Sequence, residues 1–134
     1  MRKTAVMSFL VLLLLSASAM AEEIIGKWVG KTPEGFAISY EFKEDNSVIW
    51  SVDTKGFPGP ITARYSVDFS TNPIQLDMFD YSYGSLKGLK FIGIVEFLSP
   101  TKIKIDGLRV KEEGSKTERQ KIFTARAIEF SKVE

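Results

Sequence analysis

The sequence of 134 residues contains no histidine and no cysteine. Catalysis by Ser-His-Asp or Cys-His groups is therefore excluded, as are zinc and copper sites of the usual kind. The chain also lacks the side chain that most often acts as a general acid or base near neutral pH. Disulfide bonds are impossible, so the fold must be stabilised by packing alone.

The N-terminus has the pattern of a secretory signal peptide. Arg2 and Lys3 form a basic region, an apolar run follows from Ala5 to Ser16, and Ala19-Met20-Ala21 is a small-residue cleavage motif. The apolar run is short for a membrane span, although a retained signal anchor is the alternative. We therefore predict a signal peptide over residues 1–21 and a periplasmic or secreted protein.

Residues 22–134 are long enough for one domain with a single core. Loss of Arg2 and Lys3 changes the formal net charge from +1 to −1. A charge so close to zero gives no indication of binding to nucleic acid or to a membrane surface.

Apolar and polar residues alternate with period two through most of this domain. The clearest case is residues 61–69, a pattern that fits a half-buried β-strand and not a helix. Similar alternation, or a short apolar run, predicts eight strands, within residues 22–31, 36–43, 48–53, 61–69, 74–78, 88–98, 102–106 and 122–130.

The predicted fold is all-β, an eight-stranded antiparallel up-and-down barrel. Short turns join the strands in sequence, which indicates an antiparallel meander, and closure removes exposed strand edges. A two-sheet sandwich is the alternative. Residues 88–98 are apolar on both faces, so this strand should be covered on both sides. Residues 109–121 carry eight charges, and we expect them to form an exposed loop.

Three stretches resemble a bacterial lipocalin-like, calycin-type family. Gly26-Lys27-Trp28 is similar to the Gly-x-Trp opening of these barrels. Residues 70–77 and then 88–97 are similar to that family's Pro-x-x-Ile-Asp and Gly-Ile-Tyr-Glu strands. Val95 stands at the Tyr position of the family pattern, and Ser99-Pro100-Thr101 replaces its Gly-Asp turn.

The resemblance implies a calyx that is open at one end and binds a small apolar molecule. It also implies that Trp28 packs at the closed end beneath an arginine from the last strand, a position that Arg126 would fill with a cation–π contact. Both residues would then be structural.

The inward face of the barrel is the predicted ligand site. An interior formed by eight strands is filled by side chains or leaves room for one small ligand. Most of the bulky inward residues are expected to be core, and residues with a polar tip are the better candidates for contact with a ligand. The predicted contacts are Tyr40, Trp50, Tyr65, Phe69, Met78 and Phe91. Gly93 is expected either to let the strand bend or to leave space for a ligand.

The remaining carboxylates do not indicate catalysis. Asp68 and Asp77 fall on the outer face of their strands, where no dry pocket would shift their pKa. A calcium site at Asp77 and Asp80 would lack any loop signature. We therefore predict that the protein is not an enzyme and has no cofactor or metal.

A second functional hypothesis concerns the loops. Phe57 lies in a stiff Gly-Pro turn, and Tyr81 and Tyr83 lie in a polar connection. Exposed aromatic side chains in loops can mark a binding surface. The alternative function is therefore a protein–protein interaction module of the cell envelope, of the inhibitor or immunity type, with a fully packed barrel.

Overall fold

Residues 24–134, which the computed structural model describes, form a closed barrel of eight antiparallel strands in chain order. The strands are β1 (Gly26–Lys31), β2 (Ala37–Phe42), β3 (Ser47–Val52), β4 (Ile61–Asp68), β5 (Ile74–Phe79), β6 (Leu89–Ser99), β7 (Lys102–Lys111) and β8 (Ile128–Val133). The predicted all-β up-and-down barrel is confirmed, and the sandwich alternative is wrong. The predicted signal peptide, residues 1–21, lies outside the described residues.

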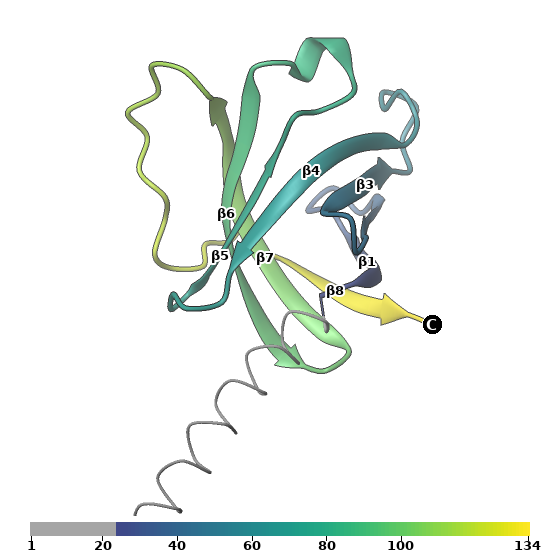
Figure 1. The fold of residues 1–134 in the computed structure, drawn as a ribbon. Coiled ribbons are helices and arrows are strands. Elements are labelled where there is room, and N and C mark those ends of the chain that lie inside the picture. Colours follow the sequence, from purple (N-terminus) through teal and green to yellow (C-terminus); the bar gives the residue numbers. More distant parts are fainter. Residues whose placement is uncertain (1–23) are drawn as a thin grey trace, which may run out of the picture.

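The two ends of the barrel carry different connections (Figure 1). The β1–β2, β3–β4 and β5–β6 connections lie at one end, which we call the upper end, because successive strands run in opposite directions. The β5–β6 connection contains the short 3₁₀ helix η1 (Gly84–Leu86). The β2–β3, β4–β5 and β6–β7 turns lie at the other, lower end. No helix of residues 24–134 is long and apolar enough to cross a membrane.

Large side chains fill the interior of the barrel. Strand alternation directs every second residue inward, and the register aligns these residues in rows, such as Trp28, Tyr40, Trp50 and Ile61 across β1 to β4. The largest fully buried side chains are Trp28, Phe42, Phe130, Ile24, Leu76, Met78, Ile94, Ile103, Val48 and Val95.

A long connection covers part of the outer face of the barrel. Residues 112–127, which we call the strap, run from β7 to β8 along the outside of the sheet (Figure 1). Beneath it lie Ile92 and Ile94, outward residues of β6 that are only 7% and 1% exposed. This explains why residues 88–98 are apolar on both faces, and it confirms that this strand is covered on both sides.

The strap is also where the predicted strand boundaries are wrong. β7 continues to Lys111, into the segment expected to be a loop, and the last strand is Ile128–Val133 and not residues 122–130. Residues 122–127 alternate like a strand, but Thr124 bonds to Asp106 and the ring of Phe123 packs under Lys104 on the outer face. These side-chain contacts replace pairing with β7.

Candidate functional site

The upper end of the barrel brings a cation onto an aromatic cluster. Arg109 is an inward residue of β7 at the rim, and its guanidinium carbon lies 4.6 Å from the centre of the Trp50 ring on β3. The arginine remains exposed to solvent, whereas Trp50 is only 9% exposed. A guanidinium over an indole is a favourable cation–π contact that leaves donors of the arginine available.

Two residues from the upper loops close over the same indole. The ring centre of Phe57 lies 4.8 Å from that of Trp50, and the ring centre of Tyr81 lies 6.1 Å away, both in edge-on geometry. Tyr81 is only 4% exposed, so the expectation that it forms part of an exposed aromatic surface is wrong. Phe57 is half-buried, and Tyr83, at 44% exposed, is the member of the group that faces solvent. Tyr81 therefore belongs to the core.

The indole N–H of Trp50 is a buried donor without an acceptor. Within residues 24–134, its Nε1 is one of three buried side-chain polar atoms that have no hydrogen-bond partner. An unsatisfied buried donor costs about 1–3 kcal/mol, so such groups in native proteins call for an explanation. By contrast, Nε1 of Trp28 donates to the carbonyl of Ile24 at 2.9 Å.

Two tyrosine hydroxyls beside Arg109 are held in their neutral form. Burial raises the pKa of Tyr81 to about 12, and the positive charge of Arg109 opposes this shift. Burial also raises the pKa of Tyr40, with a further increase from Tyr81 and an opposing effect of Arg109. At neutral pH both hydroxyls can donate or accept hydrogen bonds.

The six predicted ligand contacts lie in four different places. Tyr40 and Trp50 belong to the upper cluster, and Met78, at 2% exposed, is packed in the core. Tyr65 and Phe69 line a pocket of about 310 Å³ at the lower end. Tyr65 is also held there because its hydroxyl donates to the carbonyl of Lys43 at 2.9 Å.

Phe91, the sixth predicted contact, covers a pair of glycines. Gly93 and Gly107 face each other across β6 and β7, and a Cβ added to either would collide with the Phe91 ring. The missing side chains therefore make room for this ring and not for a ligand. An aromatic ring over strand glycines restores packing that the glycines cannot supply.

The lower end carries a second cation–tryptophan contact, but not the predicted one. Nζ of Lys132 on β8 lies 5.4 Å from the centre of the Trp28 ring. Arg126 is instead an exposed residue of the strap. The expectation that Arg126 covers Trp28 is wrong, because β8 begins two residues beyond Arg126, and a lysine of that strand lies over the indole instead.

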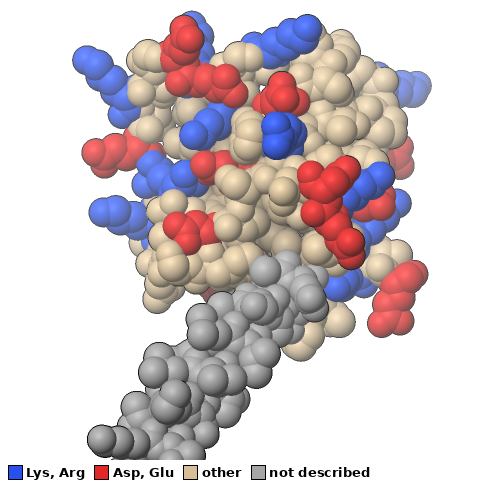
Figure 2. Space-filling model, viewed as in Figure 1, with Lys and Arg blue, Asp and Glu red and all other residues tan. Residues whose placement is uncertain are grey.

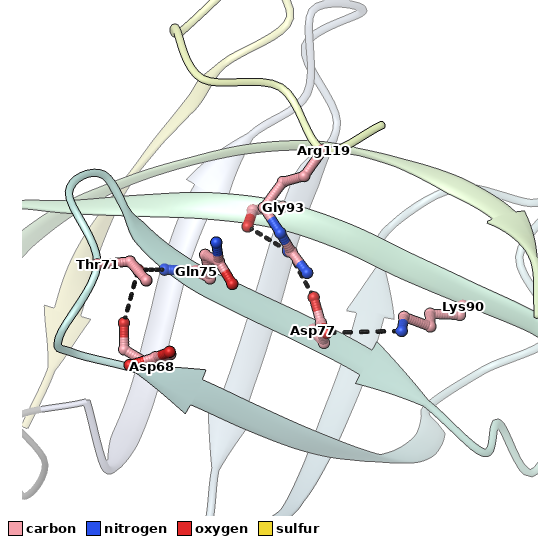
Figure 3. A network of polar contacts seen from close by, with 7 residues as sticks. All are labelled: Asp68, Thr71, Gln75, Asp77, Lys90, Gly93 and Arg119. Carbon is pink, nitrogen blue, oxygen red and sulfur yellow. Dashed lines mark hydrogen bonds and ion pairs between the residues drawn. The ribbon is translucent and has the colours of Figure 1, made fainter. Parts of the chain in front are cut away.

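Two carboxylates on the outer face hold the strap, and Figure 3 shows the contacts of the first, Asp77. Nη1 of Arg119 donates to Oδ1 of Asp77 at 2.6 Å and to the carbonyl of Gly93 at 2.9 Å. Lys90 lies 3.7 Å from the other oxygen of Asp77. The outward position of Asp77 was predicted correctly, but it is an ion-paired anchor and not an isolated surface charge.

The second anchor is Asp106, which lies on the outer face of β7 with Lys104 and is only 3% exposed. Its Oδ2 accepts from the backbone N–H of Thr124 at 2.6 Å and from the hydroxyl of Thr124 at 2.8 Å. Burial raises the pKa of Asp106, but hydrogen bonds from Thr124, from the side chain of Gln120 and from the backbone of Gly107 together outweigh it, and the net shift is downward. The carboxylate is therefore ionised beneath the strap.

A groove of about 480 Å³ lies between the strap and the lower part of β5 and β6. Its lining residues are Asn72, Pro73, Ile74, Val95, Glu96, Phe97, Lys121, Ile122 and Phe123. Among residues 24–134, no group of three or more aspartates and glutamates could hold a metal ion. Charges of both signs are interspersed over the face shown in Figure 2.

Comparisons with known proteins show the fold and nothing more specific. No protein-family model matches the sequence, and no curated protein matches it. The crystal structure of Treponema pallidum Tp0751 (pallilysin) aligns with a TM-score of 0.59 at 9% identity, covering 96% of this chain and 97% of that chain. A de novo designed fluorescence-activating β-barrel aligns with a TM-score of 0.51 at 14% identity, covering 84% of this chain and 96% of that chain. At these sequence identities the structural likeness supports the β-barrel fold and gives no information about function.

Proposed function

We propose that this protein is an exported, non-enzymatic binding protein that takes up a small hydrophobic molecule with an anionic group at the upper end of its barrel. The observation that carries the proposal is Arg109, an exposed cation placed over Trp50, whose buried N–H has no acceptor. A ligand with one carboxylate would supply an acceptor for this N–H.

The filled interior limits where such a ligand would sit. Met78, Leu76 and Phe42 are at most 2% exposed, so packed side chains fill the middle of the barrel and a ligand would have to bind nearer the rim. At the rim, Phe57 is a half-buried loop residue, and Arg109 is an exposed residue near the end of β7. An apolar tail would displace Phe57, which packs on the Trp50 ring, and the carboxylate would pair with Arg109 and accept from the uncovered N–H of Trp50.

A titration with decanoate tests the proposal. We expect heat of binding with decanoate and none with decyltrimethylammonium, which has an alkyl tail of similar length and the opposite charge. Arg109→Gln should lower the affinity for decanoate about tenfold or more, because a charged hydrogen bond contributes about 1.5–3 kcal/mol. Arg126→Gln, which removes an exposed arginine of the strap, is the matched control and should bind normally.

Equal binding of both amphiphiles, or equal binding by Arg109→Gln and the unmodified protein, would contradict the proposal. The thermal unfolding of each variant must be measured alongside, since loss of the cation over Trp50 also changes stability.

The second candidate is the protein-interaction module, and one observation favours it. Tyr83 is 44% exposed and Phe36 is 41% exposed, and both lie in connections at the upper end. Large exposed aromatic residues are common anchors of protein interfaces. If this is the function, Tyr83→Ala should abolish capture of the partner protein without changing the melting temperature. The unmodified protein should then show no binding of decanoate.

A further inference from the structure

The upper part of β7 has a free edge. β8 pairs with β7 only from Lys102 to Ile105, whereas β7 continues to Lys111 and pairs there with β6 on its other side. Within residues 24–134, no strand pairs with the outer edge of β7 beyond Ile105. The β6–β7 hairpin thus extends above the point where β8 begins, as Figure 1 shows.

The backbone groups on this edge can be assigned from the register. The N–H of Glu112 donates to the carbonyl of Gly88, so even-numbered residues of upper β7 bond toward β6 and odd-numbered ones point away. Arg109 and Lys111 therefore direct their N–H and C=O groups outward. No backbone hydrogen bond outside the strand ladders of residues 24–134 involves either residue. Such a row of unpaired groups is a template for another strand.

The side chains of the edge indicate what it would pair with. Arg109 and Lys111 share one face and are exposed, while Leu108 and Val110 share the other face and are half-buried. Opposite charges and apolar side chains placed directly across from one another stabilise a strand pair. A complementary strand would therefore alternate acidic and apolar residues.

A second copy of this chain does not fit the edge. Antiparallel pairing of two copies about a two-fold axis would place Arg109 opposite Arg109 or Lys111 of the other copy. A register with Arg109 opposite Gly107 would set Lys111 against Ile105, where β8 already pairs with β7. Like charges directly opposite each other destabilise a strand pair. The same cations that oppose self-association would favour an acidic segment.

We propose that the outer edge of β7 from Gly107 to Lys111 binds an extended segment of a partner protein with alternating acidic and apolar residues, by adding it as a strand. The proposal shares Arg109 with the ligand site proposed above, but it rests on the unpaired backbone groups of the β7 edge and not on the space over Trp50, so backbone amide protection tests it separately.

The test uses a short acetylated peptide of alternating Glu and Val as the probe. On titration into the protein, the backbone amides of Arg109 and Lys111 should shift in the ¹H–¹⁵N spectrum and become protected from hydrogen exchange. A peptide of the same sequence, N-methylated at every second residue, should not bind, because it cannot donate to the edge. A peptide of alternating Lys and Val should not bind either.

Two variants at one position separate the backbone from the charge. Lys111→Pro removes an N–H that points out of the ladder, which strands tolerate at an edge, and should lower the affinity about three- to tenfold. Lys111→Ala keeps that N–H and should lower the affinity less, and by an amount that falls as salt is added.

Three results would overturn the proposal. The first is the absence of amide shifts with the Glu-Val peptide. The second is equal binding of the N-methylated peptide. The third is a dimer in sedimentation whose Arg109 and Lys111 amides are protected without peptide, which would show that the edge pairs with a second copy. The peptide arms use the unmodified protein, so they decide the question even if Lys111→Pro fails to fold.

Discussion

The guanidinium of Arg109 lies 4.6 Å over the indole of Trp50, so a strand that rises above the barrel rim places a cation across the upper end. Lys132 and Trp28 make the corresponding contact at the lower end, at 5.4 Å. The two ends differ in one respect. The N–H of Trp28 is bonded to Ile24, while the N–H of Trp50 has no acceptor within the described residues.

The glycine pair at the centre of the β6–β7 hairpin should tolerate no side chain. Gly93→Ala places a Cβ against the Phe91 ring and 2.7 Å from the carbonyl oxygen of Asp106. The free energy of unfolding should therefore fall by about 1–3 kcal/mol. Chemical denaturation measures this change. Gly84→Ala is the control, since a Cβ there has nothing within 4 Å. A neutral Gly93→Ala variant would show that the hairpin adjusts and that Phe91 is not fixed over the glycines.

The ion pair between Asp77 and Arg119 should stabilise the strap against local opening more than it stabilises the barrel against unfolding. Both side chains are about one-fifth exposed, so Arg119→Ala should cost about 0.5–1.5 kcal/mol of unfolding free energy. Hydrogen exchange should increase across residues 112–127 and stay unchanged in β1 to β4. Asp77→Asn and the double variant complete a double-mutant cycle. Additive effects would mean that the pair does not act as a unit.

Stability should fall at alkaline pH because of the buried tyrosines. The folded-state pKa of Tyr81 is raised to about 12 and that of Tyr40 is also raised, against an ordinary value of 10.0. Above pH 10 the unfolded chain therefore loses these protons first. The unfolding free energy should decrease by up to about 1.4 kcal/mol per pH unit for each group until the folded-state pKa is reached. Tyr81→Phe should reduce this slope, and an unchanged slope would contradict the burial of its hydroxyl.

At acidic pH the strap should be released through Asp106. Its folded-state pKa is lower than the ordinary 3.8, so its contribution is fully present above that value and is lost as pH falls through the folded-state pKa. Asp106→Asn should reduce stability at neutral pH and make it less dependent on pH below 4. Hydrogen exchange of the Thr124 amide, which donates to this carboxylate, reports the release directly. Equal protection of that amide in both proteins would contradict the account.

Most of the barrel can be predicted from the sequence because alternation is a local signal. Residues 61–69 show it plainly, and in the barrel β4 buries Ile61, Ala63 and Tyr65 and exposes the residues between them. The β6 strand is apolar on both faces, and this alone indicated a cover on its outer side. The identity of that cover could not be predicted, because it depends on contacts over long sequence distances, such as Arg119 with Asp77.

The errors have a common cause in the strap. Residues 122–127 alternate like a strand, and no local pattern reveals that Thr124 bonds to Asp106 or that Phe123 packs under Lys104. The same displacement of the last strand moved the predicted partner of Trp28 from Lys132 to Arg126. At the upper end, the need of Trp50 for a polar partner was visible in the sequence. The role of Arg109 was not, because its segment resembled a loop.

The most direct test of the proposed function is the indole region of the ¹H–¹⁵N spectrum during a titration with decanoate. The chain has two tryptophans, so each spectrum contains its own control. The account predicts that the Trp50 indole signal shifts progressively while the Trp28 signal, already bonded to Ile24, stays in place. A Trp50 signal that does not move, or equal movement of both signals, would contradict binding at the upper end of the barrel.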